Sequence, residues 1–421
     1  MPDLKLLLAQ VIVILIAARG LGWLLHRLHQ PRVIGEMVAG IALGPTLLGW
    51  LAPSLSATLF PRASLGALHA LSQLGLLLFM FLIGLELDLK QLRELGRVAV
   101  YTSVASIVAP FTLGGLLALF LYPRFSEPRV NFAIFACFIG TAISITAFPV
   151  LARILTERGL LRTRVGALAL TCAAVNDATA WCILAGLIAV LRASQQTAAS
   201  PWLLLLGLCA FVSLMLSVVR RALRQLTERF ERTRELTHGL LAVILLFVLV
   251  SAWVTEALGV HALFGAFLTG LVMPRQAELT HALWLRIEAL VVVLLLPLYF
   301  ALTGLRSSFL LIAGAQAWLG CALLIGCAIV GKLGGSMLAA RRNGLPWREA
   351  GAVGVLMNTH GMVELVILNL GLDLGLISPT LFAMMVLMAL ATTLMAAPLL
   401  SWIYPAHLVN VPKPAEVAPR H

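Results

Sequence analysis

Asp177 is an acidic residue in the middle of a long apolar stretch, from about residue 165 to residue 190. If Arg164 marks the cytoplasmic end of a membrane helix, Asp177 lies roughly 13 residues, or ~20 Å, along it, close to mid-membrane. A charged carboxylate at that depth costs at least about 2.5 kcal/mol. The residue is therefore either a neutral aspartate that is hydrogen-bonded within a helix bundle, or a carboxylate in a polar cavity that exchanges a proton for another ligand.

Two further apolar stretches contain polar residues beside residues that break helices. In the first, Ser144 and Thr146 precede Pro149, which has no amide hydrogen to continue a helix. In the second, the interrupting residues are Asn358, Thr359, His360 and Gly361. Irregular backbone at membrane depth persists only where it is buried in protein or lines a wet cavity. We expect two broken helices that place hydroxyl groups and free carbonyls beside Asp177, although two kinked helices with ordinary packing would give the same pattern.

The elements that must position these residues are membrane helices. The chain has 421 residues, of which 61% are hydrophobic and only 11% are charged, and long apolar runs recur along it. This composition predicts an all-α polytopic membrane protein with about thirteen transmembrane helices. The expected spans are 4–25, 33–51, 65–87, 97–122, 131–156, 164–191, 201–219, 237–255, 260–274, 281–304, 312–339, 346–371 and 378–403.

The net charge of +12 indicates membrane topology and not a nucleic-acid partner. Lys and Arg are concentrated in alternate loops, most densely at residues 220–234. The positive-inside rule then places the N-terminus outside and the C-terminus, with a short tail at 407–421, in the cytoplasm. The same positive charge can contact anionic membrane lipids. The six cysteines have no ligand spacing and predict neither a metal site nor a disulfide.

Three short segments of the first half recur, in the same order, in the second half. Residues 38–45 (VAGIALGP) resemble 268–274 (LTGLVMP), residues 81–86 (FLIGLE) resemble 301–306 (ALTGLR), and residues 144–149 have a looser counterpart at 357–361. An odd number of spans separates each pair, so the two halves have opposite orientations. Inverted repeats are typical of secondary transporters, which bind substrate where the repeats meet. We expect repeats at about 4–191 and 237–403, linked by a helix at about 201–219, within one transmembrane domain at 1–406.

Five motifs together resemble the monovalent cation:proton antiporter-2 family of the sodium/hydrogen exchanger superfamily, and most closely its plant-type cation/proton exchanger branch. They are SITAFPVLARIL at 144–155, AAVND at 173–177, HALFGAF at 261–267, NTHGMVEL at 358–365 and LNLGLDLG at 368–375. The resemblance covers residues 5 to 405 or so. It implies a thirteen-helix fold with crossed broken helices, in which a dimerisation domain stands beside a mobile ion-binding domain. It also implies a homodimer in the plasma (inner) membrane that works by elevator-like alternating access.

The resemblance also assigns roles to individual residues. Asp177 matches the carboxylate that binds the cation and the proton, and Asn176 stands where electrogenic members carry a second aspartate. Lys332 matches the basic residue on the span that faces this pair, whereas Thr146 and Ser144 match the unwound segment. These oxygen atoms form a plausible shell for a hard monovalent cation such as sodium or potassium.

The expected mechanism is exchange of one cation for one proton. A carboxylate provides a site that the two ligands cannot occupy together, and Asn176 leaves Asp177 as the single acid of the pair, so the exchange should be electroneutral. Lys332 has two interpretations. It either stabilises the fold by pairing with Asp177 or with helix carbonyls, or it is a counter-ion whose amine could release a second proton and make the exchange electrogenic.

The second interrupted segment holds two further ionisable residues. His360 stands where the plant-type pattern has Lys or Arg, so this chain departs from the family in its fixed positive charge. Glu364 follows one helical turn later, where it either forms a hydrogen bond with His360 or takes part in ion binding.

Two other classes of protein bear on the same residues. A proton-regulated cation channel is the alternative, because an acidic centre and broken helices could line a pore. An enzyme is not indicated, since the chain lacks a Gly-rich phosphate loop, a zinc-binding His pair and a nucleophile elbow. No cofactor is expected.

Overall fold

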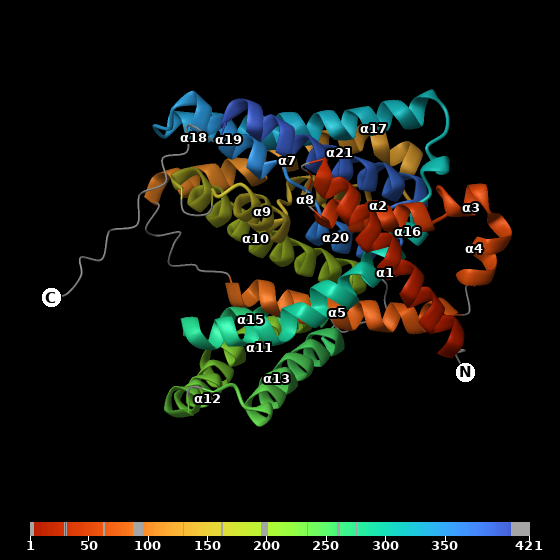
Figure 1. Cartoon of the computed structure of the whole chain (residues 1–421). Coiled ribbons are helices and arrows are strands. Elements are labelled where there is room, and N and C mark those ends of the chain that lie inside the picture. Colours follow the sequence, from red (N-terminus) through yellow and green to blue (C-terminus); the bar gives the residue numbers. More distant parts are fainter. Residues whose placement is uncertain are drawn as a thin grey trace.

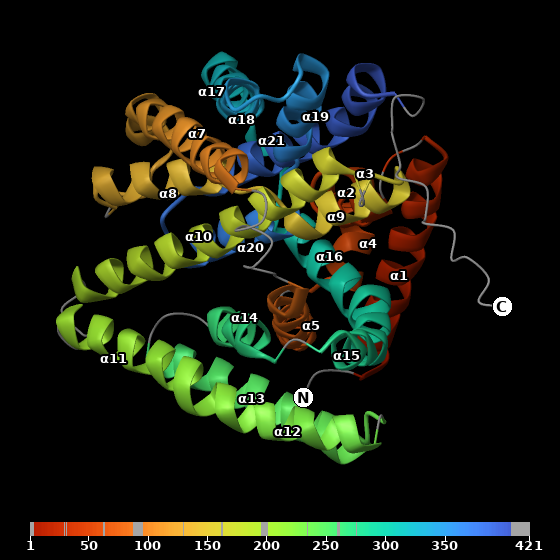
Figure 2. The same cartoon turned by 90° about the vertical axis from the view of Figure 1, so that its left-hand side faces the viewer.

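The computed structural model describes residues 4–28, 30, 32–61, 64–86, 96–128, 130–160, 163–194, 201–233, 235–258, 262–274 and 276–405. Within these ranges every regular element is a helix and there is no strand, as the composition predicts. The helices fall into two groups according to which elements contact each other. Helices α7, α17, α18, α19 and α21 lie above α11, α12, α13 and α15 in both views (Figures 1 and 2).

The first group, which we call the frame, combines the beginning of the chain with residues 201–311. Its elements are α1 (Leu4–Arg27), α2 (Arg32–Leu43), α3 (Leu48–Leu51), α4 (Pro53–Leu59), α5 (Leu65–Glu86), α11 (Pro201–Leu214), η2 (Met215–Val219), α12 (Arg220–Thr233), α13 (His238–Ala257), α14 (Ala262–Val272), α15 (Ala277–Leu290), η3 (Val291–Leu295), α16 (Leu296–Arg306) and η4 (Phe309–Leu311).

The second group, which we call the core, carries all the site residues predicted from the sequence. Its elements are α7 (Gly96–Phe125), α8 (Phe132–Ser144), α9 (Phe148–Glu157), α10 (Arg164–Ser194), α17 (Ala315–Ala328), η5 (Ile329–Gly334), α18 (Gly335–Arg342), α19 (Trp347–Met357), α20 (Met362–Asp373) and α21 (Pro379–Ile403). Helix α19 is buried along most of its length, and so is α20. The core therefore encloses its own broken helices.

Most of the helices have the length and composition of membrane spans. Ten helices in the described residues are long and apolar enough to cross a bilayer. Helices satisfy their own backbone hydrogen bonds, which is the condition for crossing the apolar interior of a membrane. Two shorter apolar helices, α8 and α14, fall within predicted spans. The structure confirms a polytopic helical membrane protein, whereas the count of thirteen spans stays a prediction.

The segment after the predicted linker helix differs from expectation. The sequence predicts a linker helix that ends near residue 219 and a basic loop at 220–234, but α12 continues the helix to Thr233. The segment RRALRQLTERFERT contains strong helix formers and neither Gly nor Pro, so nothing stops the helix. Leu223, Thr227 and Phe230 lie buried on one face of α12 at helical spacing.

Two crossings of glycine-containing helices join the halves of the frame. Helix α2 crosses α16, where a Cβ atom on Gly304 would lie 1.9 Å from the carbonyl carbon of Gly40. Helix α5 crosses α14, where a Cβ atom on Gly270 would lie 2.2 Å from the oxygen of Phe81. These four helices carry the segments that resemble each other in sequence, α2 with α14 and α5 with α16. Each crossing therefore pairs a segment of one half with a segment of the other half, and the second crossing is equivalent to the first. An inverted repeat requires such a pair of equivalent crossings, and small residues are what permit backbones to approach so closely.

Frame and core meet at a polar contact between the ends of α16 and α20. Arg306 Nη2 lies 2.8 Å from Asp373 Oδ1, and Arg306 Nη1 donates to Asn369 Oδ1 at 3.3 Å. The amide of Asn369 donates in turn to Tyr299 Oη at 3.2 Å and to Thr303 Oγ1 at 3.0 Å. This contact ties α20, which carries part of the candidate site, to the frame.

Candidate functional site

The first helix break lies between α8 and α9. Helix α8 ends at Ser144, and Ile145 is extended with φ −77° and ψ 139°. Helix α9 then starts at Phe148, so Pro149 lies in its first turn. Proline is favoured there because the amide that it lacks would have no partner within the helix. Pro149 therefore lies in the first turn of the second half-helix, and the break itself precedes that helix.

The second break lies between α19 and α20. Helix α19 ends at Met357, and α20 begins at Met362. The four intervening residues are the polar cluster recognised in the sequence: Asn358, Thr359, His360 and Gly361. Their backbone is tied to α21, because His360 N donates to Thr393 Oγ1 at 3.1 Å.

The two breaks lie against each other and exchange hydrogen bonds. Ala147 N donates to Thr359 O at 2.9 Å, and Thr146 Oγ1 donates to Met357 O at 2.9 Å. A Cβ atom on Gly361 would lie 2.8 Å from Val150 Cγ2, so the second break fits tightly over α9. The expected juxtaposition of two broken helices is therefore present in the structure.

Asp177 on α10 is the buried acid beside this crossing. Its side chain has no exposed surface, and neither carboxylate oxygen has a hydrogen-bond partner among the described residues. The amide of Phe148, at the start of α9, interacts with this carboxylate but does not reach hydrogen-bond geometry. The carboxylate also interacts electrostatically with Lys332. Both oxygens of this buried carboxylate are therefore able to accept further hydrogen bonds or to bind a ligand.

Asn176, the neighbour of Asp177, is fixed in place by hydrogen bonds. Its Nδ2 lies 3.0 Å from Ser106 Oγ and donates to Thr146 Oγ1 at 3.2 Å. Ser106 lies on α7, and sequence analysis did not identify it as a site residue. Helix α7 also contains Thr102, Ser103 and Thr112, so the sequence gives no reason to single out Ser106, and only the packing of α7 against α10 reveals its position.

Lys332 reaches the same point from η5, a π-helical turn between α17 and α18. Such turns occur often at functional sites because they shift one side chain out of the regular helical register. The lysine is fully buried, and Nζ donates to Thr146 Oγ1. Its ammonium interacts electrostatically with both Asp177 and Glu364. Thr146 therefore joins three elements that are far apart in sequence.

The remaining predicted residues occupy different positions around the crossing. Ser144 Oγ donates to Thr141 O at 2.8 Å, which leaves its oxygen free to accept. Asn358 Oδ1 is buried and has no partner among the described residues. The ring of His360 lies between two helices, with Nδ1 2.9 Å from Thr392 Oγ1 and Nε2 3.3 Å from Ile143 O. Neither ring nitrogen is hydrogen-bonded to Glu364 among the contacts of the described residues.

Two features named from the sequence fall outside the described residues: His261, which begins one motif, and the tail at 407–421. Where the structure is described, no group of three or more His, Cys, Asp or Glu side chains is placed to hold a metal ion. The candidate site is instead built from one free carboxylate, amide and hydroxyl oxygens, and broken-helix carbonyls. Such oxygen atoms suit hard cations.

Comparison with known proteins is consistent along nearly the whole chain. The family described as "Sodium/hydrogen exchanger, transmembrane" matches residues 11–404. The Na(+)/H(+) antiporter NhaS4 of Synechocystis sp. is 44% identical over 96% of this chain and 98% of its own length. Cation/H(+) antiporter 18 of Arabidopsis thaliana is 41% identical over 95% of this chain, and K(+)/H(+) antiporter 1 of Saccharomyces cerevisiae is 35% identical over 96%.

The chain spans about half the length of the Arabidopsis and yeast relatives, 49% and 47% respectively. Among solved structures, the sodium proton antiporter MjNhaP1 from Methanocaldococcus jannaschii matches with a TM-score of 0.63. That match covers 96% of this chain and 98% of the other at 13% identity. At so low an identity, the likeness concerns the fold.

Proposed function

We propose that Asp177 binds the cation and the proton in turn, because this chain belongs to the transmembrane sodium/hydrogen exchanger family and is a cation/proton antiporter. One observation carries the proposal: both oxygens of this fully buried carboxylate lack hydrogen-bond partners among the described residues, at the point where two broken helices cross. A protonated carboxyl group is neutral there, and an ionised one needs a cation. The two ligands therefore exclude each other.

The other ligands of the cation come from the neighbouring helix and the two breaks. The oxygens of Asn176, Thr146 and Ser144 surround the first break, and Asn358 Oδ1 is a further buried acceptor at the second. In the arrangement described, Thr146 Oγ1 already accepts hydrogen bonds from Lys332 and from Asn176. A cation that uses this oxygen must displace one of those donors, and displacement of the Lys332 ammonium by another positive charge is the natural choice. The second break also contains Thr359 and His360, and Glu364 follows it in the first turn of α20.

The exchange we propose is electroneutral, with sodium or potassium as the cation. Asn176 leaves one carboxylate in the pair, so a bound cation displaces one proton. The relatives are named as Na(+)/H(+), K(+)/H(+) and cation/H(+) antiporters, which fits a monovalent cation without selecting one. Electrogenic exchange, with a second proton on Lys332, is the alternative.

Movement of the core against the frame would open the site to either side of the membrane. In support of this elevator-like motion, every proposed ligand belongs to the core, and the most extensive helix contacts, such as those of α1 with α2 and of α7 with α8, lie within the frame or within the core. Residues 4–191 or so would form one repeat, and residues 237–403 or so would form a second repeat of opposite orientation. The helix that links them, near 201–219, would belong to the frame. A cytoplasmic tail would start at residue 407.

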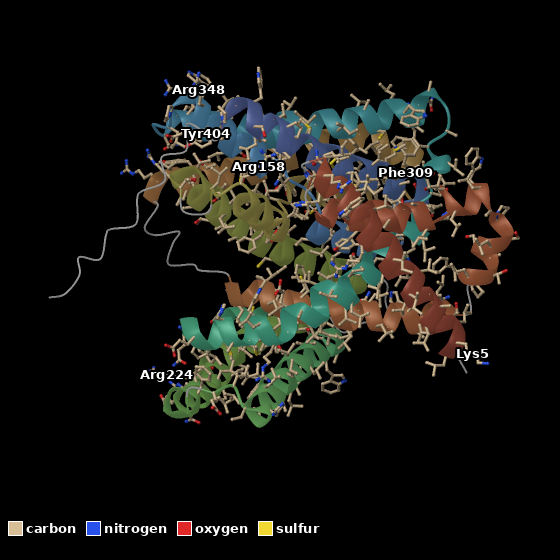
Figure 3. The ribbon with its side chains drawn as sticks, viewed as in Figure 1. Lys5, Arg158, Arg224, Phe309, Arg348 and Tyr404 are labelled. Atoms are coloured by element: carbon tan, nitrogen blue, oxygen red, sulfur yellow. The ribbon has the colours of Figure 1, made fainter. Side chains whose placement is uncertain are left out.

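We place the protein in the plasma (inner) membrane with its N-terminus outside. Figure 3 shows Arg224 and Arg348 toward one end of the molecule and Lys5 at the other, which fits a cytoplasmic side rich in arginine. Arginines of α12 would contact anionic lipid headgroups on that side. A homodimer through the frame is the proposed assembly.

The test is exchange by purified protein in proteoliposomes, followed with a pH-sensitive dye on addition of lithium, sodium, potassium or rubidium. Asp177→Asn keeps the shape of the side chain but cannot exchange a proton, so we expect it to fold normally and to lose exchange. Robust exchange by this variant at any pH would remove Asp177 from the mechanism. A voltage-driven current without coupled proton flux would favour the channel alternative.

A further inference from the structure

Glu364 is a second buried carboxylate close to the crossing. It lies in the first turn of α20, directly after the second helix break, and its side chain has no exposed surface. Neither of its oxygens has a hydrogen-bond partner among the described residues. A buried acid without hydrogen bonds is costly, so its retention calls for an explanation.

Lys332 supplies that explanation. Its buried ammonium lies near enough to Glu364 and to Asp177 for an electrostatic interaction, although among the described residues it makes no hydrogen bond to either carboxylate. Its hydrogen bond to Thr146 places it close to both breaks. A buried ammonium requires a negative partner at all times. Asp177 cannot serve throughout the transport cycle, because it is neutralised whenever it holds a proton and is shared whenever it holds a cation.

We infer that Glu364 is the permanent counter-charge of Lys332, a positioning residue that leaves Asp177 free to exchange its proton for the cation. The inference rests on the proposed role of Asp177. The N-terminus of α20 contributes to the same effect, because a carboxylate in the first turn of a helix is stabilised by the free amides there. His360, the other ionisable residue at this break, is held by Thr392 and by the carbonyl of Ile143 and does not take the place of Glu364.

The charge of the site follows directly. With a proton on Asp177, the charges of Lys332 and Glu364 cancel and the site is neutral. With a cation on Asp177, the cation cancels Asp177 while Lys332 and Glu364 still cancel each other. Both loaded forms are therefore neutral and can cross the apolar barrier, whereas the empty ionised form carries a net negative charge and cannot.

Removal of the Glu364 charge should therefore have two effects. Lys332 would turn to Asp177 as its sole partner and compete with the cation for that carboxylate. Both loaded forms would also carry one positive charge through the barrier, which slows the movement of the core. Glu364→Gln isolates this effect, because the amide has nearly the same shape and the carboxylate it replaces makes no hydrogen bond among the described residues.

The experiment measures the potassium and sodium concentrations that give half-maximal exchange by the full chain in proteoliposomes at fixed pH. We expect Glu364→Gln to raise them at least about tenfold, because breaking a buried charge pair is costly. The double variant Lys332→Gln with Glu364→Gln should recover most of that loss, since it removes both charges. Glu228→Gln, on an exposed glutamate of α12, is the matched control and should leave them unchanged.

Three results would overturn the inference: unchanged half-maximal concentrations in Glu364→Gln, a double variant no better than Glu364→Gln, or a double variant without exchange. If Glu364→Gln does not fold, recovery of folded protein in the double variant supports the pairing, and its failure contradicts it. Loss of exchange in Asp177→Asn tests the proposed function separately. Absence of exchange by the unmodified chain would overturn both.

Discussion

At the scale of single residues, the hydroxyl of Thr146 is where the helices of the site converge. It accepts from Lys332 of η5 and from Asn176 of α10, and it donates to Met357 O at the end of α19. One small side chain thus connects both breaks and the helix that carries Asp177. A change at this position should alter cation binding without touching the carboxylate itself.

Thr146→Val removes this hydroxyl at nearly constant volume. We expect apparent cation affinity to fall by the value of about one hydrogen bond, ~1 kcal/mol, or roughly fivefold. The measurement is the half-maximal cation concentration for exchange in proteoliposomes. Thr146→Ser keeps the hydroxyl and serves as the control. Equal affinities for Thr146→Val and the unmodified chain would mean that the hydroxyl only holds the broken helices together.

At the scale of elements, the glycine crossings of the frame set how closely the two halves approach. Gly304→Ala would place a methyl group 1.9 Å from the backbone of Gly40, and backbone cannot move aside as a flexible side chain can. We expect a loss of about 1–3 kcal/mol or more in stability, seen as a lower melting temperature in detergent. Gly326→Ala, in α17, is the control, because nothing lies within 4 Å of the added methyl group. Similar melting temperatures for the two variants would contradict the tight crossing.

The contact between α16 and α20 offers a test of the relative motion of frame and core. Cysteines in place of Arg306 and Asp373 would replace a contact in which Nη2 and Oδ1 lie 2.8 Å apart. If the core moves as proposed, a short bifunctional cross-linker that joins these cysteines through disulfide bonds should stop exchange, and a thiol reducing agent, which cleaves those disulfides, should restore it. The measurement is proton flux in proteoliposomes before and after cross-linking.

The matched control for this experiment places both cysteines within the core. Phe125 O accepts from Ser378 N at 3.3 Å, so these positions are adjacent but do not bridge frame and core. Their cross-link should leave exchange largely intact. The exposed native cysteines, Cys182 and Cys209, are first replaced by serine. Full exchange with the 306–373 cross-link in place would contradict an elevator-like motion.

At the scale of the whole molecule, the charge moved in each transport cycle distinguishes the two stoichiometries. One carboxylate in the pair, with Asn176 beside it, predicts exchange of one proton for one cation. Valinomycin and potassium, which clamp the membrane potential, should then not accelerate proton efflux driven by sodium, provided that sodium is accepted. Solid-supported membrane recordings should show little steady charge transfer. A transient current whose sign follows the proton gradient, and which disappears in Lys332→Gln, would assign a second proton to that lysine.

Local patterns in the sequence were sufficient to predict the class of protein, and they indicated the residues of the candidate site. Apolar runs predict membrane helices because the bilayer admits few alternatives. Asp177 and the two polar interruptions are visible for the same reason, since each is costly at membrane depth and stands out from its surroundings. The glycine-containing repeats also predict an inverted pair of halves, and their segments meet at equivalent crossings in the frame.

The partners of each side chain were decided only by the tertiary structure. Lys332 meets Thr146 across 186 positions of the chain, and Ser106 meets Asn176 across 70. Pro149 lies in the first turn of the half-helix after the break, and Glu364 interacts electrostatically with Lys332 and makes no hydrogen bond with His360 among the described residues. Hydropathy and helix-breaking residues act over a few neighbours, whereas these contacts depend on how distant helices cross. For that reason the sequence indicates which residues are polar at membrane depth, and the fold determines which of them share a charge or a hydrogen bond.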